Sequence, residues 1–181
     1  MRDDATFVSP HNISVAMVIQ RFRPHFSGQG IQLELLCKKL ALKGVRSTIV
    51  TSAYGDASSE EFLDGYRIVR LRTVMSQTSN SGFAKFTRDP IFSMRAFSWL
   101  LRQHSIDLVH VHATTDALYS SWLACCLQQR PLIFEMTLLN VDDPVTIIQK
   151  RNYLSVLRRM LLRRCDGYVA ISPALAQRCK E

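Results

Sequence analysis

Two histidines, His110 and His112, stand two residues apart in the largely apolar segment Asp107–His112. In a strand this spacing places both side chains on the same face of the sheet, and a same-face pair could bind a metal ion. No nearby Cys, Asp or Glu completes a ligand set, since Asp107 begins the strand and is expected to be a cap or turn residue, so packed histidines are favoured and no metal site is predicted. His112 ends the segment, where its side chain could reach a ligand, whereas His110 lies deeper and is expected to be structural.

Two adjacent carboxylates, Asp142 and Asp143, follow the apolar segment that ends at Met136. Their oxygens could accept hydrogen bonds from sugar hydroxyls or hold a cation together with water. Asp143 would equally serve as the N-cap of a helix that begins near Pro144, and both interpretations stay open. Glu135 lies inside the preceding strand, where a buried carboxylate is costly unless it is paired. We expect Glu135 either at an exposed sheet face or paired with an arginine, and a catalytic role for it stays open.

A turn-rich segment with two glycines, Gln20–Gly30, precedes an amphipathic stretch. Glycines at a helix N-terminus let backbone N–H groups approach an anion, and the helix dipole adds attraction. The segment contains neither G-x-G-x-x-G nor Gly-Lys followed by Ser or Thr, which argues against a dinucleotide or nucleoside-triphosphate site. Gly28 and Gly30 therefore indicate either an anion-binding turn or a tight turn without a ligand.

Basic side chains without any acidic neighbour occupy the stretch from Lys150 to Arg164. Leu154, Leu157 and Leu161 mark an apolar side, so an amphipathic helix is expected. Such a helix can lie on an anionic membrane surface, but a solvated face packed by its other side on the sheet is the simpler interpretation. Aromatic residues are not interleaved with the basic ones and no reading motif occurs, so nucleic acid is not an expected partner.

Along the whole sequence, short apolar segments typical of strands alternate with amphipathic segments typical of helices. Strands are predicted at Ile13–Ile19, Ser47–Ser52, Tyr66–Leu71, Asp107–His112, Pro131–Met136 and Gly167–Ile171. Helices are predicted over Leu33–Ala41, Ile91–His104, Asp116–Gln128 and 145–164, with a last one from Pro173. Residues 53–62 are predicted as a loop and 73–90 as a polar, mobile connection. The alternation is typical of an α/β fold with a doubly wound, mostly parallel, Rossmann-like sheet and helices on both faces.

In such a sheet, ligands bind beyond the carboxyl ends of the strands, near the point where the strand order reverses. The segments that follow the predicted strands carry Gly28, His112, Asp143 and Ser172. The pattern therefore predicts that these side chains lie beside one crevice.

Composition excludes several classes of protein. The 181 residues are 47% apolar and 21% charged, with 7 Gly and 6 Pro, which suits a packed core and argues against disorder. No apolar run approaches the roughly 20 residues that cross a membrane, and residues 1–12 lack the apolar core of a secretory signal. The 5 cysteines have no ligand-like spacing and are expected to be reduced core residues of a cytoplasmic protein. The net charge of +8 indicates anionic partners without identifying one.

Several segments, taken in order, resemble the N-terminal domain of a GT-B glycosyltransferase of the retaining family 4. They are Ile13–Ile19 with Arg21-Phe-Arg-Pro, then Ser27-Gly-Gln-Gly with the helix and strand that follow it, then Ile106–His112, and finally Asp166–Leu175. The sequence departs from the family pattern at the paired glycines, at the acid that follows them and at the histidine after the fifth strand, where it has Ser27, Gly30 and Thr137.

The resemblance implies that residues 13–181, after an N-terminal extension of residues 1–12, form an acceptor-side domain, with the nucleotide-sugar held by a C-terminal domain outside this chain. It implies sugar transfer from a nucleotide-sugar donor to a glycan, lipid or small-molecule hydroxyl, without a further cofactor and with little activity in this chain alone. By the same resemblance, donor phosphate or acceptor would contact the glycine turn at Ser27, Gly28 and Gly30. The catalytic residues, at the ends of the fourth and fifth strands and beyond them, would be His112, Thr137 and Asp143. Asp142 and Ser172 would bind the acceptor.

The expected location is the cytoplasm, with attachment to the inner membrane face through Lys150–Arg164 as an option. The alternative function is a non-catalytic Rossmann-like binding module. A nicotinamide-cofactor enzyme is disfavoured because the glycine fingerprint is missing.

Overall fold

The computed structural model describes residues 12–24, 27–53, 55–73, 82–112, 116–141, 143–149 and 155–180. Within them a seven-stranded sheet has the order β3-β4-β2-β1-β5-β6-β7, and every neighbouring pair is parallel except β3 with β4. The strands are β1 (Ser14–Val18), β2 (Arg46–Ser52), β3 (Glu60–Leu63), β4 (Tyr66–Leu71), β5 (Leu108–His112), β6 (Leu132–Met136) and β7 (Gly167–Ala170). The predicted Rossmann-like α/β fold is confirmed.

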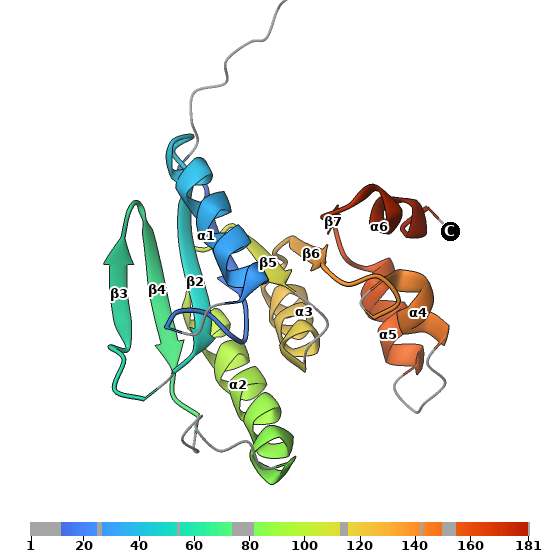
Figure 1. The fold of residues 1–181 in the computed structure, drawn as a ribbon, viewed down its shortest axis with the longest axis horizontal. Coiled ribbons are helices and arrows are strands. Elements are labelled where there is room, and N and C mark those ends of the chain that lie inside the picture. The colour runs from blue at the N-terminus through green and yellow to red at the C-terminus, as the bar shows by residue number, and fades with distance from the viewer. Residues whose placement is uncertain are drawn as a thin grey trace, which may run out of the picture.

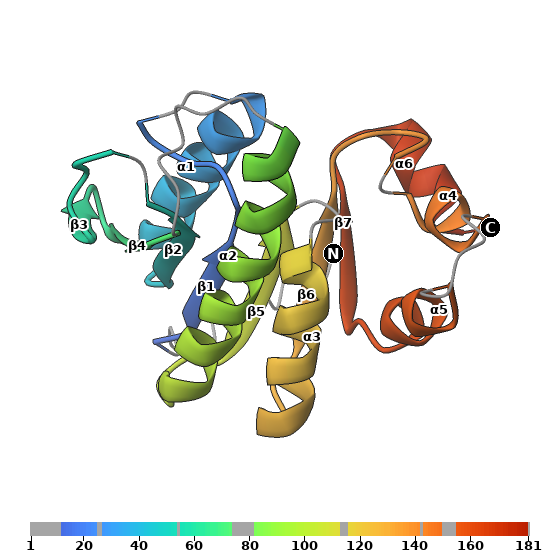
Figure 2. The ribbon, with the colours of Figure 1, turned by 90° about the horizontal axis from the view of Figure 1, so that it is seen from below.

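Helices cover both faces of this sheet (Figures 1 and 2). They are α1 (Gly28–Ala41), α2 (Gly82–Arg102), α3 (Asp116–Gln128), α4 (Pro144–Gln149), α5 (Ser155–Arg163) and α6 (Pro173–Arg178). Helices α2 and α3 lie side by side, while α4, α5 and α6 gather at the β7 end of the sheet (Figures 1 and 2). None of the helices in the described residues is long and apolar enough to cross a bilayer.

Strand β1 shows why the first apolar run is nearly continuous. Its side chains alternate between two buried clusters: Ala16 and Val18 pack in the cluster that includes α2 and α3, and Val15 and Met17 pack in the cluster that includes α1. A central strand covered on both faces needs apolar residues at every position. The resulting core lies on both sides of the sheet and fixes the strand ends that carry the site.

An edge hairpin corrects the prediction of a loop over residues 53–62. Strand β3 pairs antiparallel with β4 through a tight turn at Asp64 and Gly65, whose φ angles are 33° and 87°. Asp-Gly between two strands is a strong hairpin signal because both turn residues adopt positive φ. The polar composition of β3 concealed the strand, since an edge strand does not need two apolar faces.

Two helix boundaries also differ from the sequence prediction. Helix α2 begins at Gly82 and contains Pro90, so residues 82–90 are helical where a mobile connection was predicted; residues 74–81 lie outside the described residues. The single helix predicted over 145–164 is instead two helices, α4 and α5, and residues 150–154 between them are not described. Tertiary packing explains the first difference, because Phe92, Ala96 and Leu100 anchor α2 in the core.

The cysteines agree with the sequence prediction in part. All are free thiols, and Cys37 and Cys125 are buried. Burial raises the pKa of the Cys37 thiol to about 11 and that of Cys125 to about 12, so both stay protonated and inert at neutral pH. Cys126, by contrast, is exposed because it follows Cys125 on a helix and points to a different side.

Candidate functional site

One edge of the sheet gathers most of the predicted site residues. Because β1, β5, β6 and β7 are parallel, the segments that follow them emerge at the same edge. A side-chain contact joins two of these segments: the Gln29 amide Nε2 donates a hydrogen bond of 2.9 Å to the Thr137 hydroxyl Oγ1. The start of α1 and the segment after β6 therefore lie directly side by side, as the predicted crevice requires.

The glycine turn is the first turn of α1, with Ser27 as its N-cap. The Gly30 N–H donates to Ser27 Oγ at 3.0 Å, and the Ile31 N–H donates to the Ser27 carbonyl at 3.1 Å. By helix geometry the N–H groups of Gly28 and Gln29 have no intrahelical acceptor. They are the backbone donors that this helix end can offer to an anion.

The two glycines differ in the space around them. A Cβ on Gly28 would meet nothing within 4 Å, whereas a Cβ on Gly30 would lie 3.2 Å from Ser27 Oγ and 3.5 Å from the Phe22 ring. A side chain at Gly30 would thus crowd the Ser27 hydroxyl inside the turn. Gly28 has open space where a side chain would be, so a ligand could approach its backbone closely.

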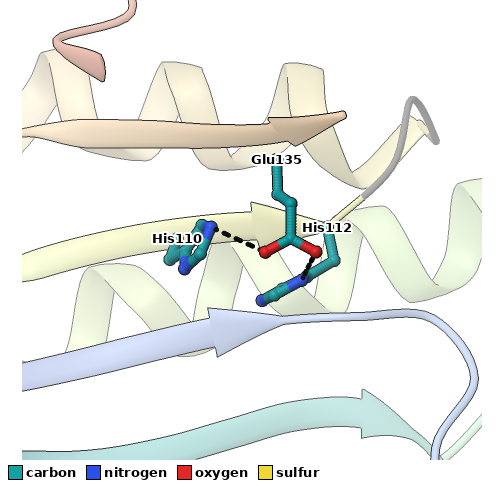
Figure 3. Close-up of side chains that lie close together, drawn as sticks. All are labelled: His110, His112 and Glu135. Atoms are coloured by element: carbon teal, nitrogen blue, oxygen red, sulfur yellow. Dashed lines mark ion pairs between the residues drawn. The ribbon is translucent and has the colours of Figure 1, made fainter. Parts of the chain in front are cut away.

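A cluster of three buried side chains, His110, His112 and Glu135, lies across β5 and β6 (Figure 3). Their exposed fractions are 6%, 2% and 4%. His110 Nε2 is 3.4 Å from Glu135 Oε2, and His112 Nδ1 is 3.2 Å from Glu135 Oε1. Two predictions are therefore wrong: Glu135 is neither exposed nor paired with an arginine, and an acidic side chain does lie beside the two histidines.

Strand register explains the cluster. Parallel pairing of β5 with β6 sets His112 opposite Glu135 and His110 opposite Ile133. Val109 and Val111 pack in the cluster that includes α2 and α3, so the alternate residues of β5 point to the other face of the sheet. There the Glu135 carboxylate lies between both imidazole rings, as Figure 3 shows.

Burial and charge set the protonation of this cluster. Burial, reinforced by the neighbouring His112, lowers the pKa of His110 to about 3, so its ring is neutral at ordinary pH. Burial alone would raise the pKa of Glu135, but the adjacent His112 and His110 outweigh it and hold that pKa below its usual value. The cluster therefore presents an ionised carboxylate and a neutral imidazole to any ligand.

Two further predicted site residues act as helix caps. Asp143 is fully buried, and its Oδ1 accepts a 2.9 Å hydrogen bond from the Thr146 N–H at the start of α4. Ser172 Oγ accepts a 3.3 Å hydrogen bond from the Leu175 N–H at the start of α6. Of the two interpretations left open for Asp143, the structure shows the cap. Asp142 lies outside the described residues.

Gln29 and Glu135 are the residues that sequence reasoning did not place in the site. The sequence held a signal for Glu135. It is the last residue but one of the predicted strand Pro131–Met136, and His112 is the last residue of the preceding predicted strand, Asp107–His112. Parallel pairing of these two strands would have brought the residues together. No spacing rule identifies Gln29, whose partner Thr137 is 108 residues away in sequence.

Comparison with known proteins gives this arrangement a family. The family described as the glycosyl transferase 4-like domain matches residues 27–181. The chain belongs to this family. The matched range begins at the Ser27 cap and includes the segments that follow β5, β6 and β7. No curated protein matches the chain in sequence.

Solved structures share the fold of this glycosyl transferase 4-like domain. Sucrose-phosphate synthase from Thermosynechococcus elongatus matches with a TM-score of 0.64 at 17% identity, over 93% of this chain and 44% of that one. UGT89C1 from Arabidopsis thaliana, solved with UDP-L-rhamnose, matches with a TM-score of 0.61 at 13% identity, over 91% of this chain and 43% of that one. UDP-GlcNAc 2-epimerase from Methanocaldococcus jannaschii matches with a TM-score of 0.54 at 10% identity, over 93% and 42%. The chain thus spans less than half the length of each of these proteins.

Proposed function

We propose that this chain is the acceptor-side part of a glycosyltransferase that moves a sugar from a nucleotide-sugar donor to an acceptor hydroxyl. The family match over residues 27–181 is the observation that carries the proposal. It favours a transferase over a non-catalytic Rossmann-like module. A second domain that holds the nucleotide-sugar is part of the proposal, because the chain covers 44% of sucrose-phosphate synthase.

The donor end of the reaction is assigned to the first turn of α1. Retaining transfer develops positive charge at the sugar carbon and negative charge on the departing diphosphate. The Gly28 and Gln29 N–H groups, at the positive end of the helix dipole, could stabilise that negative charge. The open space at Gly28 supports close approach of a ligand, and the Ser27 cap keeps the turn in place.

The acceptor end is assigned to the segments after β5 and β6. Thr137 is the side chain that would orient the acceptor hydroxyl, and Gln29 holds Thr137 at the glycine turn. His112 is buried beside Glu135 and would support this segment from beneath. Asp143 and Ser172 would contribute indirectly, because their oxygens already cap α4 and α6. Acceptor binding by Asp142 stays a proposal from the sequence.

The test is a donor screen with the longest natural protein that contains this sequence. Released nucleoside diphosphate is measured for each nucleotide-sugar across candidate glycan, lipid and small-molecule acceptors. Failure of every donor to release diphosphate in an acceptor-dependent way would contradict the proposal.

A glycine substitution sharpens the same test. Gly28→Val should abolish transfer while leaving the thermal melting temperature close to that of the wild type, because its side chain enters open space. Gly30→Val is the matched comparison: it should lower the melting temperature, because its Cβ would crowd the Ser27 hydroxyl and its methyl groups would have to fit beside the Phe22 ring. Normal turnover by Gly28→Val would exclude a role for Gly28 in donor binding.

A membrane surface is proposed as a further partner of α5. Val156 and Met160 are 72% and 45% exposed, and Arg159, Arg163 and Arg164 beside them are exposed too. Apolar and basic side chains on one exposed surface suit an anionic lipid interface. The chain should sediment with phosphatidylglycerol vesicles and lose this binding when the three arginines are changed to Glu. Binding that survives the charge reversal would show that α5 is not the anchor.

A further inference from the structure

We propose that His110, His112 and Glu135 form a binding site for one divalent transition-metal ion of the Zn²⁺ type. The proposal does not depend on sugar transfer, because it concerns the side chains between β5 and β6 and can be measured without a substrate. It reverses the prediction from sequence that the chain has no metal site.

The three side chains converge as metal ligands do. The ligand atoms, one from each residue, lie within 4.8 Å of one another. A tetrahedral ion with bonds of about 2.0 to 2.1 Å holds its ligand atoms roughly 3.3 to 3.4 Å apart. The two nitrogen-to-carboxylate separations, 3.4 and 3.2 Å, have this size, although they end on different oxygens of Glu135, Oε2 and Oε1. A small rotation of the side chains would bring all three onto one ion.

The strand geometry makes this convergence a built feature. His110 and His112 project from the same face of β5, with ring centroids 4.3 Å apart and ring planes inclined by 36°. Glu135 comes from the adjacent strand, directly opposite His112. Ligands on two central strands of a packed sheet are held more rigidly than ligands on loops. The site therefore needs no rearrangement of the backbone to bind an ion.

Unpartnered ring nitrogens distinguish a metal site from a simple ion pair. Among the described residues, His110 Nε2 and both ring nitrogens of His112 lack a hydrogen-bond partner although they are buried. The contacts of these nitrogens with Glu135, at 3.4 and 3.2 Å, have ion-pair distances. Buried polar atoms without partners are rare in folded proteins. A metal ion would occupy lone pairs of both rings and neutralise the carboxylate.

The chemistry of the three ligands indicates the class of ion. Two imidazoles and one carboxylate match the ligands of zinc sites, and the same set also holds other divalent transition ions. Mg²⁺ and Ca²⁺ prefer sites made of oxygens. Three protein ligands leave one coordination position of a tetrahedral ion for water.

The test measures metal on the purified full chain. After removal of metals with a chelator, the chain is incubated with Zn²⁺, freed of excess ion, and analysed for zinc by mass spectrometry. We expect about one Zn²⁺ per chain, a melting temperature that rises with Zn²⁺ concentration, and the visible absorption of tetrahedral Co²⁺ after replacement. Absence of retained zinc on the wild-type chain would overturn the proposal, whatever the variants do.

Variants identify the ligands. Glu135→Gln and His112→Ala should lose the zinc, the Co²⁺ absorption and the zinc-dependent rise in melting temperature. His104→Ala removes an exposed histidine outside the cluster and should retain all three. Zinc bound equally by Glu135→Gln and by the wild type would place the ion elsewhere, for example at the free cysteines, and would overturn the assignment.

Discussion

Asp143 and Glu135 are both buried carboxylates, yet the chain stabilises them in opposite ways. Asp143 accepts a hydrogen bond from the Thr146 N–H, three residues along the same helix. Glu135 lies between two histidines of a neighbouring strand, more than 20 positions earlier in the chain. One oxygen of the first carboxylate, Oδ1, is bonded by local backbone, whereas the second carboxylate finds its partners only through the tertiary fold.

The difference indicates which of the two is available for chemistry. A cap oxygen that is already bonded to the backbone has a structural role, whatever lies near it. The carboxylate of Glu135 shares its space with ring nitrogens that have no other partner among the described residues. Its surroundings can therefore rearrange around a ligand, whereas those of Asp143 would lose a helix start.

Removal of the Glu135 side chain should give the largest effect. In metal-free buffer, Glu135→Ala should lower the free energy of unfolding by about 2 kcal/mol, because it leaves two buried imidazoles without their shared polar partner. Urea denaturation followed by circular dichroism measures this loss. Glu60→Ala is the matched control: it breaks an exposed 2.8 Å pair with Arg67 and should cost less than about 1 kcal/mol. Equal losses in the two variants would remove the contrast between buried and exposed carboxylates.

Removal of the local carboxylate should cost less. Asp143→Ala should lower the free energy of unfolding by about 1 kcal/mol, the usual cost of a lost N-cap. Asp143→Asn keeps an oxygen that can accept from the Thr146 N–H and should recover most of that loss. The same urea experiment decides the outcome. A loss for Asp143→Ala as large as that for Glu135→Ala would show that Asp143 does more than cap α4.

The smallest effect is a dependence on pH. Burial would raise the pKa of Asp143, but hydrogen bonds from Thr146 and the charge of Arg178 hold it below the ordinary value of 3.8. A depressed folded-state pKa stabilises the protein above the unfolded-state value, and this contribution is lost as the pH falls through the folded-state value. The difference in unfolding free energy between wild type and Asp143→Asn should therefore shrink as the pH is lowered from about 5 to about 3. A difference that stays constant would exclude a contribution from the charge.

Features with a local cause were predictable from the sequence. The apolar run of β1, the helix start at Pro173 and the N-cap role open to Asp143 each follow from residues within one turn or strand. The turn that follows strand β3, Asp64-Gly65, is also a local signal, but the polar composition of β3 concealed the strand itself. Helix α2 escaped prediction over residues 82–90 because contacts of Phe92, Ala96 and Leu100 with the core decide its stability.

The sequence by itself determined the alternation of strands and helices, and with it the α/β fold and the sheet edge where a ligand can bind. Hydrophobic periodicity and capping preferences depend on near neighbours, so they can be read along the chain. Only the tertiary structure decided that Glu135 faces His112 and that Gln29 bonds to Thr137. Strand order and register are set by packing of the whole core, and a shift of one residue would have turned Glu135 to the opposite face.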